Sequence, residues 1–452
     1  MWKSCREHAG KIQKSFILLV LLILTSELFG QATTVDSPQN RVDSDWIAEK
    51  LDGFLRLYRN LHAHPELSFK EEKTAGRIAA ELDEMGVEVT SNVGGHGVVG
   101  VFRNGSGKTL MMRTDLDGLP VREQTELVYA SKETTIGSTG SEVGVMHACG
   151  HDIHMTNFVG VASYLIEHKA DWTGTLLLVA QPAEERGAGA KAMLKDGLFT
   201  KFPRPDYALA YHVDASLRTG DISFLGGYQQ ANVDSVDITV KGRGGHGAYP
   251  HTTIDPVVQA AQLILALQTI VSREVDPIEP AVVTVGSIHG GSKHNVIDDD
   301  CYLQLTVRSY SSVVRKQLHE AIKRIAKGVA ETCGAPEPVV DISEGTPSLR
   351  NDVNLANRLR PVFVATLGKE HVHESTPSMG GEDFSRYGQA GVPILMIRLG
   401  SVNEQRLKRF EMLGVPGPSL HSPRYYPDAK ETLNCSIRAM SAAALDLLAP
   451  KQ

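Results

Sequence analysis

Apolar side chains recur at helical spacing near the start of the chain, in residues 45–61. Five of them fall on one face of a helix: Ile47, Leu51, Phe54, Leu55 and Tyr58. Residues 73–84 repeat this pattern, and Gly86 follows as a stop signal. Further along, short apolar runs alternate with helical patterns. This alternation predicts an α/β fold with a mixed, largely parallel sheet.

Three of the apolar runs lead directly into ionisable side chains. They are residues 109–112 before Asp115 and Asp117, residues 175–180 before Glu184 and Glu185, and residues 207–211 before His212. In open α/β sheets, ligands bind beyond the carboxyl ends of the strands. We therefore expect these side chains to meet at one edge of the sheet. Asp115 and Asp117 share a face in extended backbone, as metal ligands or as carboxylates that support them.

The pattern changes between residues 228 and 335. Two half-buried strands, 234–240 and 302–307, accompany two helices, 255–271 and 313–332. Glycine-rich joints flank this segment, and from Val339 the α/β pattern resumes with a helix at 351–367 and a strand at 393–399. We therefore predict an inserted α+β domain at 228–335 within a discontinuous catalytic domain, 45–227 and 336–449.

The N-terminal segment has the features of a secretory signal. Four basic side chains, Lys3, Arg6, Lys11 and Lys14, precede the apolar run 16–24, which is shorter than the roughly 20 residues of a membrane span. We predict a signal peptide at residues 1–32 and an exported protein, periplasmic or secreted. After its removal we expect no stable membrane insertion. An uncleaved membrane anchor is the alternative.

The remaining composition is that of an ordinary globular protein. The net charge of −7 does not favour nucleic-acid binding, so a small molecule is the expected partner. Five cysteines in 452 residues are too few for a disulfide scaffold. A single bridge from Cys301 to Cys333 or to Cys435 stays open.

The segment MHACGHDIHM gathers candidate metal ligands. Cys149, His151 and His154, with His147 nearby, offer a thiolate and imidazoles, which suit a metal such as zinc. Asp152 is expected to orient a metal-bound imidazole. The alternatives are a structural cysteine in a histidine-rich loop, or a disulfide at Cys149.

Other side chains are candidates of lower specificity. In the adjacent pair Glu184–Glu185, one carboxylate can bind a metal while its neighbour faces the substrate. Alone, His212 and His421 would be ordinary polar residues, and His246 would serve a glycine-rich turn of the inserted domain. Two further residues, Asn295 and Arg308, can hold a substrate carboxylate, the arginine as a bidentate fork.

Eight motifs occur together in a defined order: RTDLDGLP, MHACGHDIH, QPAEE, YHV, GRGGHGAYPH, KHNVID, MGGEDFS and LHSPRYY. In this combination the chain, from about His62 to Asp428, resembles the metal-dependent amidohydrolase and peptidase family. That family includes hippurate hydrolase, bacterial N-acyl-amino-acid amidohydrolases and plant indole-acetyl-amino-acid hydrolases. The resemblance implies a two-domain hydrolase with an inserted lid or dimerisation domain and a two-metal site.

The resemblance also implies roles for particular residues. The implied metal ligands are Cys149, His151, Glu185, His212 and His421. Glu184 matches the general base, and His246 matches a lid histidine that reaches the active site, often from a partner subunit. Asn295 and Arg308 fall where the family contacts the substrate carboxylate. The implied cofactors are two divalent ions, Mn²⁺ or Zn²⁺, with Ni²⁺ and Co²⁺ as further options, and the implied assembly is a homodimer through the inserted domain.

We therefore expect a binuclear-metal amidohydrolase that cleaves the amide bond of N-acyl amino acids. Water activated by the metals would be the nucleophile, with Glu184 as general base. The main alternative is a metallo-exopeptidase acting on dipeptides. An alternative of another class is a secreted solute-binding protein without turnover.

Overall fold

The computed structural model describes residues 42–137 and 140–450, so the predicted signal peptide lies outside the described residues. The α-helices are α1 (Ser44–Ala63), α2 (Glu72–Glu84), α3 (His151–Glu167), α4 (Gly189–Lys195), α5 (Leu198–Lys201), α6 (Pro256–Thr269), α7 (Ser312–Thr332), α8 (Val353–Leu367), α9 (Ser385–Gln389), α10 (Glu404–Met412) and α11 (Ala429–Leu447). The strands are β1 (Glu88–Val93), β2 (Gly97–Asn104), β3 (Lys108–Asp115), β4 (Thr134–Ile136), β5 (Glu142–Gly144), β6 (Gly174–Gln181), β7 (Tyr207–Arg218), β8 (Ile222–Phe224), β9 (Gly227–Gln230), β10 (Asn232–Lys241), β11 (Gly245–His246), β12 (Ala281–Gly290), β13 (Val296–Ile297), β14 (Asp300–Ser309), β15 (Val339–Glu344), β16 (Leu349–Asn351), β17 (Val372–Glu374) and β18 (Ile394–Val402).

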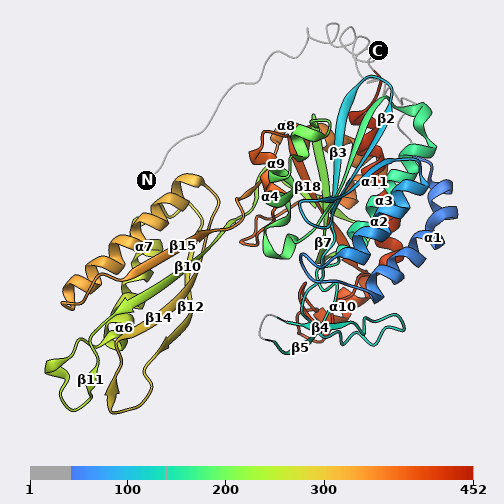
Figure 1. Cartoon of the computed structure of the whole chain (residues 1–452). Coiled ribbons are helices and arrows are strands. Elements are labelled where there is room, and N and C mark those ends of the chain that lie inside the picture. Colours follow the sequence, from blue (N-terminus) through green and yellow to red (C-terminus); the bar gives the residue numbers. More distant parts are fainter. Residues whose placement is uncertain (1–41, 138–139, 451–452) are drawn as a thin grey trace, which may run out of the picture. The chain divides into compact units, whose positions relative to one another are not determined.

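An eight-stranded sheet forms the centre of the fold, in the order β1-β2-β6-β3-β7-β18-β8-β17 (Figure 1). Strand β3 pairs in parallel with β6 and with β7, and β7 pairs in parallel with β18. Strands β1, β2 and β6 pair in antiparallel fashion. The predicted α/β class with a mixed sheet is therefore confirmed.

Helices cover both faces of this sheet. Leu110 and Leu178 belong to one core with residues of α1, α3 and α11, whereas Met111 and Leu177 belong to another with residues of α4 and α9. Because both faces are buried, the central strands are continuously apolar, which is the pattern that the sequence showed.

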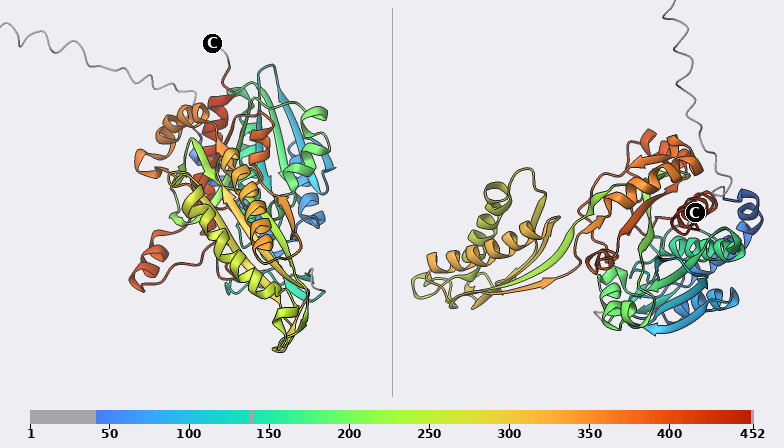
Figure 2. Two further views of the ribbon diagram at one scale, coloured as in Figure 1. Left: turned by 90° about the vertical axis from the view of Figure 1, so that its left-hand side faces the viewer. Right: turned by 90° about the horizontal axis from the view of Figure 1, so that it is seen from above.

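A second sheet has its own core, in the order β12-β14-β10-β15. We call its strands, with α6 and α7, the inserted sheet; both helices lie on one face of it (Figure 2). The buried side chains of β10, at Val236, Ile238 and Val240, all point to that face.

Three boundaries differ from the sequence interpretation. The strand β15 pairs with β10, so the interpretation that the catalytic α/β pattern resumes at Val339 is wrong for this strand. Its residues are largely exposed, as expected at a sheet edge. The helix predicted from residue 351 begins at Val353, because the Asp352 carboxylate accepts the backbone N–H of Leu355 as a cap. Strand β7 continues to Arg218, so His212 lies within the strand and not at its end.

The cysteines Cys149, Cys301, Cys333 and Cys435 are free thiols, so neither disulfide that the sequence left open is formed. Within residues 42–137 and 140–450, no helix combines the length and the apolar character that crossing a bilayer requires.

Candidate metal centre

The loop before α3 places two side chains at the carboxyl-end edge of the central sheet. Gly150 separates Cys149 from His151, the first residue of α3, and adopts a left-handed conformation with φ of 76°. A Cβ atom there would lie 2.6 Å from a methyl group of Val213 on β7. Both the left-handed backbone and the close approach of Val213 therefore require glycine at this position. This tight turn brings the Cys149 thiol and the His151 imidazole close to β7.

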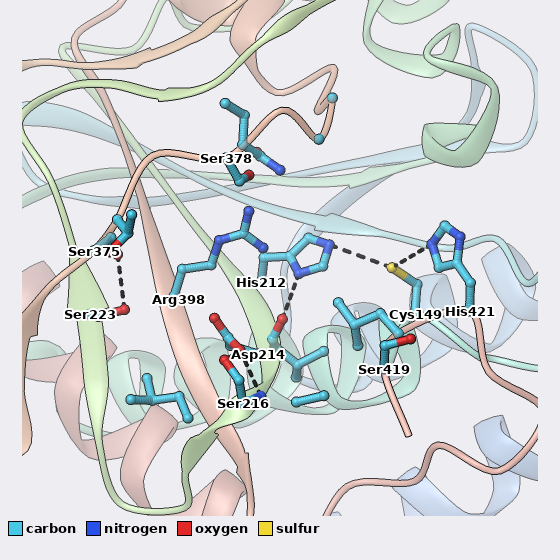
Figure 3. Close-up of a pocket in the computed structure, with 18 of the residues that line it drawn as sticks. Cys149, His212, Asp214, Ser216, Ser223, Ser375, Ser378, Arg398, Ser419 and His421 are labelled. Atoms are coloured by element: carbon cyan, nitrogen blue, oxygen red, sulfur yellow. Dashed lines mark hydrogen bonds between the residues drawn. The ribbon is translucent and has the colours of Figure 1, made fainter. Parts of the chain in front are cut away.

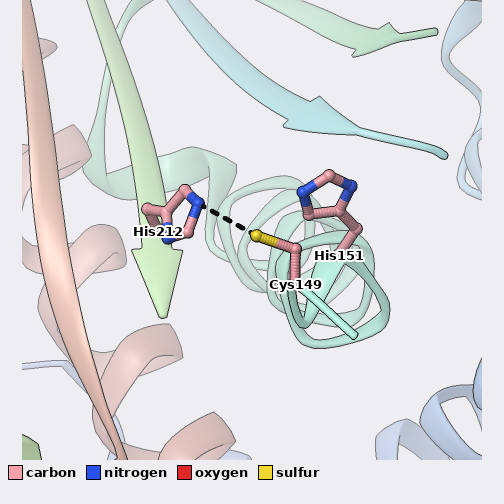
Figure 4. A group of neighbouring side chains, drawn as sticks. All are labelled: Cys149, His151 and His212. Atoms are coloured by element: carbon pink, nitrogen blue, oxygen red, sulfur yellow. Dashed lines mark hydrogen bonds between the residues drawn. The ribbon is translucent and has the colours of Figure 1, made fainter. Parts of the chain in front are cut away.

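The structure brings together all five side chains of the implied ligand set. Figures 3 and 4 show Cys149 with His151, His212 and His421. The Cys149 sulfur lies 3.6 Å from Nε2 of His212 and 3.3 Å from Nε2 of His421. One oxygen of Glu185 lies 3.5 Å from Nε2 of His421 and 3.9 Å from Nε2 of His151. These atoms come from segments that are up to 272 residues apart.

The donor set fits a divalent cation. Within the described part of the chain, Nε2 of His151 and Oε1 of Glu185 are buried and have no hydrogen-bond partner. Buried polar atoms without partners are costly, and a cation would satisfy both. One sulfur, three imidazoles and a carboxylate are the ligand types that zinc and similar metals bind. Their role as ligands stays a prediction.

Two of the imidazoles are oriented by their second nitrogen. Nδ1 of His151 donates to the backbone carbonyl of Asp117 at 2.7 Å, and Nδ1 of His212 donates to that of Val213 at 2.8 Å. Such bonds fix the ring and leave Nε2 with its lone pair directed at the cluster, as in metal-binding histidines.

The carboxylate of Asp117 holds the Glu184–Glu185 turn in place. It accepts the backbone N–H of Glu184 at 3.1 Å and that of Glu185 at 3.0 Å, and the Ser68 hydroxyl donates to it at 2.6 Å. The preceding residue, Ala183, has a positive φ of 51°, a strained conformation for a residue with a side chain. Asp117 therefore acts as a positioning residue for both glutamates.

Asp115 supports the cluster through His154. Nδ1 of His154 donates to Asp115 at 2.7 Å, and Nε2 accepts the backbone N–H of Val213 at 2.9 Å. Because both nitrogens are engaged, His154 buttresses β7 in this arrangement and is not free to bind a metal. His147 is buried, and it does not belong to any of the candidate ligand groups among the described residues.

The expectation that Asp152 orients a metal-bound imidazole is wrong. Its Oδ2 lies 2.6 Å from Nδ1 of His62, and its Oδ1 accepts the backbone N–H of Ile153. The other nitrogen of His62 lies 3.1 Å from Glu123. At the start of α3, Asp152 therefore ties the helix to the end of α1 rather than to a ligand.

The three predicted lid and substrate residues fall in two places. The exposed His246 lies on β11, paired with Val296 of β13, and the backbone carbonyl of Asn295 accepts the N–H of Gly247 at 2.9 Å. These two residues therefore lie together at the β11–β13 ribbon, and neither lines the pocket beside the cluster. Arg308 of β14 does line that pocket, and its Nη1 donates to the carbonyl of Met379 at 3.3 Å.

The pocket is open and has a volume of about 1420 Å³. Cys149, Glu184, Glu185, His212 and His421 line one side of it.

A sequence profile of Peptidase family M20/M25/M40 matches residues 111–410, which include most of the central sheet, the whole inserted sheet and four of the five clustered side chains. The chain belongs to this family.

Relatives of known name support the assignment to the M20 family. Thermostable carboxypeptidase 1 of Saccharolobus solfataricus is 35% identical over 80% of this chain and 88% of its own length. Hippurate hydrolase of Campylobacter jejuni is 38% identical over 73% of this chain and 84% of its own length. A crystal structure of a dinuclear metal-binding M20 peptidase from Bacillus subtilis superposes with a TM-score of 0.73 at 29% identity, covering 89% of this chain and 99% of that one. The protein is thus a metal-dependent hydrolase of amide bonds, as the motifs implied.

Burial shapes the protonation of the M20 site. The pKa of the Glu184 carboxyl lies well above its usual range, because the group is buried and because Glu382 and Glu185 carry like charge nearby. Burial also raises the pKa of Glu185 to about 7, although His151 opposes the shift. The pKa of His212 is well below its usual range, because of burial and the nearby Arg398 guanidinium, which keeps the imidazole neutral.

Some residues of this M20 site were not singled out from the sequence. Arg113 is fully buried and donates to Gln181 at 3.0 Å, to Asp115 at 2.7 Å, and to Glu382 and Asp383 at 3.1 Å each. The motifs RTDLDGLP, QPAEE and MGGEDFS contain these residues, but nothing in their spacing shows that they are buried together. Arg398 lies in no motif, and its only signal is a charge within the apolar run 393–399.

Proposed function

We propose that this protein cleaves the amide bond of N-acyl amino acids with two divalent cations and with Glu184 as general base. The observation that carries the proposal is the convergence at the pocket. Two buried atoms without partners, Nε2 of His151 and Oε1 of Glu185, face the Cys149 thiol and two further imidazoles, and Glu184 is buried beside them.

The cations would be held by the five clustered side chains, Cys149, His151, Glu185, His212 and His421. Divalent ions at such a site supply Lewis-acid chemistry, polarising an amide carbonyl and making water more acidic. Mn²⁺ or Zn²⁺ are the proposed ions, with Ni²⁺ and Co²⁺ as alternatives. The thiolate favours zinc.

Glu184 performs the proton transfers in this proposal. Its carboxylate accepts a proton from the attacking water and returns it to the nitrogen of the departing amine. Two features suit it to this role. Its backbone is held by Asp117, and it lines the pocket although the residue is only 8% exposed.

His246 is proposed to stabilise the oxyanion from a partner subunit. In this chain, His246 and Asn295 lie together on the exposed β11–β13 ribbon and do not line the pocket. A homodimer formed through the inserted sheet would let the ribbon of one subunit complete the site of the other. Arg308 already lines the pocket, where it would bind the substrate carboxylate.

The relatives favour two substrate classes. Hippurate is an N-acyl amino acid, and hippurate hydrolase is among the relatives at 38% identity. The name of the carboxypeptidase relative favours a second candidate, a metallo-exopeptidase acting on dipeptides. We further propose that the protein is exported by a signal peptide at residues 1–32, which lie outside the described residues.

Parallel assays of N-acetyl amino acids, N-benzoyl amino acids and dipeptides test the proposal. Each assay is run with metal-loaded protein, after chelation, and after re-addition of Mn²⁺ or Zn²⁺. We expect turnover of N-acyl amino acids that chelation abolishes and metal restores. Faster turnover of dipeptides would favour the exopeptidase instead, and binding of these compounds without turnover would indicate a solute-binding protein.

A further inference from the structure

Arg398 occupies a position of chemical interest in the central sheet. It is the one charged residue of β18, whose other residues are largely apolar and buried. β18 lies between β7 and β8, and the register places Arg398 opposite His212 on one neighbour and opposite Ser223 on the other. Its side chain is half-buried and lines the pocket (Figure 3).

Among the residues that the structure describes, the guanidinium of Arg398 has no acidic partner. Among residues 42–137 and 140–450, no carboxylate lies within 4.0 Å of it, and no side-chain hydrogen bond is formed by it. Asp214 lies on β7 two residues beyond His212, the register partner of Arg398, and its carboxylate accepts the Ser216 backbone N–H at 2.8 Å and the Ser216 hydroxyl at 2.6 Å. Arg113 on β3 of the same sheet, by contrast, contacts three carboxylates, which belong to Asp115, Glu382 and Asp383.

An anionic ligand would supply the charge partner that the Arg398 guanidinium lacks among the described residues. Arg398 stands beside His212, one of the side chains proposed to hold the cations. A guanidinium next to bound cations experiences like-charge repulsion that a half-buried position screens poorly. A ligand carboxylate at this wall of the pocket would relieve the repulsion and would match the fork geometry of the guanidinium.

A second guanidinium that has no acidic partner in the described part of the chain lines the same pocket. Arg308 donates to the Thr306 hydroxyl at 3.0 Å and to the Met379 carbonyl at 3.3 Å, and no carboxylate of the described chain lies within ion-pairing distance. Arg186 also lines the pocket, but it is exposed, so water solvates its charge. The pocket therefore offers two guanidiniums, on β14 and on β18, for two separate carboxylates.

Hydroxyl groups complete the wall around Arg398. Ser223, Ser375 and Ser378 line the pocket on this side, and the Ser375 hydroxyl donates to that of Ser223 at 2.9 Å. Hydroxyls beside a guanidinium can donate further hydrogen bonds to a carboxylate.

We propose that Arg398 is a specificity-determining residue that binds a second carboxylate of the substrate. The preferred substrates would then be N-acyl amino acids with two carboxylates, one at Arg308 and one at Arg398. This inference rests on the proposed function. The second carboxylate can belong to the amino-acid side chain or to the acyl group, and the chemistry recognised is the same in both cases.

Two matched substrate pairs distinguish these sources. N-acetyl-glutamate against N-acetyl-glutamine tests the amino-acid half, and N-succinyl-leucine against N-butyryl-leucine tests the acyl half. We expect a preference of about tenfold or more in kcat/KM for the charged member of one pair. The absence of a preference in both pairs would overturn the proposal.

Variants assign the preference to Arg398. We expect Arg398→Met to lower kcat/KM for the preferred dicarboxylate by about 10- to 100-fold and to change the neutral partner by less than about threefold. Turnover of the neutral substrate also shows that the variant is folded. For the dicarboxylate, the kcat/KM of Arg398→Lys should lie between those of wild type and Arg398→Met, because lysine keeps the positive charge but lacks the fork geometry of the guanidinium. Arg409→Met is the matched control, since Arg409 is exposed on α10 and does not line the pocket. If Arg398→Met lowered kcat/KM by the same factor for the dicarboxylate and for its neutral partner, the proposal would be contradicted.

Calorimetric titration separates this inference from the proposed function. Glutarate and butyrate are titrated into zinc-loaded wild type and into the Arg398→Met variant. If no N-acyl amino acid is hydrolysed but the variant binds glutarate about tenfold more weakly than wild type does, the proposed function fails and the carboxylate site stands. If substrates are hydrolysed and neither glutarate binding nor substrate preference changes, the carboxylate site fails and the proposed function stands.

Discussion

His62 and Asp152 form a buried pair that joins two helices across 90 residues of sequence, with 2.6 Å between Nδ1 and Oδ2. His62 lies in the last turn of α1, and Asp152 lies in the first turn of α3. The helix dipoles favour a positive charge on His62 at the C-terminal end of α1 and a negative charge on Asp152 at the N-terminal end of α3. The pair anchors the start of α3, where His151 faces the other candidate metal ligands.

This pair predicts a stability that depends on pH. Burial lowers the pKa of His62, but the hydrogen bonds to Asp152 and Glu123 outweigh burial and raise it to about 9. Because the folded protein holds this proton more tightly than the unfolded chain does, protonated His62 stabilises the fold. The stabilisation is complete at pH values below the unfolded pKa of 6.5, and it is lost as the pH rises through about 9. We expect His62→Gln to lower the free energy of unfolding by on the order of 3 kcal/mol more at pH 6 than at pH 10.

Urea unfolding at the two pH values measures this difference. His64→Gln is the control, because His64 is exposed and lies two residues further along the chain. It should change the free energy of unfolding by less than about 1 kcal/mol at both pH values. An equal loss for His62→Gln at pH 6 and pH 10 would show that the pair is not charged in the folded protein.

Glu184→Gln is expected to reduce turnover by about 10²- to 10⁴-fold, because the amide cannot accept the proton of the attacking water. The Glu184 backbone N–H still donates to Asp117, so the loop should keep its form and metal content should change little. The checks are kcat with an N-acyl amino acid and metal analysis of the same sample. Glu411→Gln, an exposed residue at the pocket, serves as control and should stay within about twofold. A Glu184 variant within tenfold of wild type would refute the assigned role.

Cys149→Ala is expected to weaken metal binding by at least about tenfold, because its sulfur lies within 3.6 Å of His212 and 3.3 Å of His421. Without a cation, burial and the charge of Glu185 raise the pKa of the Cys149 thiol well above its usual range. A metal would supply the charge that favours the thiolate. Metal content after dialysis against a weak chelator is the measurement. Cys333→Ala, which removes a free thiol just after α7, should retain the wild-type content.

Asp117→Asn is expected to lower kcat by about 10- to 100-fold and the free energy of unfolding by about 1–3 kcal/mol, since one of two backbone N–H groups would face an amide NH₂. Ser68→Ala removes a single donor to the same carboxylate and should cost about 1 kcal/mol or less with most turnover retained. Steady-state kinetics and denaturant unfolding of both variants test this. A loss of stability in Asp117→Asn with unchanged kcat would mean that the carboxylate supports the fold without positioning the glutamates.

The apolar patterns predicted most of the secondary structure near the site. The helix expected at 45–61 is α1, and the runs that lead into Asp115, Glu184 and His212 are strands β3, β6 and β7. Such patterns are informative because a residue on a buried strand or a helix face must be apolar whatever it contacts. The assignment of residues 339–344 failed because an edge strand carries a short, mostly exposed pattern that does not identify its partner.

Residue chemistry alone predicted a metal site among Cys149, His151 and His154, with His147 nearby and one carboxylate of the pair Glu184–Glu185 as a further ligand. The family resemblance gave the set Cys149, His151, Glu185, His212 and His421, without His154. Neither source showed that both nitrogens of His154 form hydrogen bonds within the protein, or that Asp152 pairs with His62. Hydrogen-bond partners depend on which atoms meet in space, and the partners of Asp152 come from segments that sequence spacing does not connect.

The sequence by itself determined which segments form buried strands and helices, and which side chains carry metal and acid–base chemistry, because periodicity and donor type are local properties of the chain. The tertiary structure alone decided which charges are satisfied. Arg113 on β3 pairs with three carboxylates, whereas Arg398 on the more apolar β18 lines the pocket and pairs with none among the described residues. Both are single arginines beside apolar residues in the sequence, and only the packing of neighbouring strands separates a structural ion pair from a group that is free to bind a ligand.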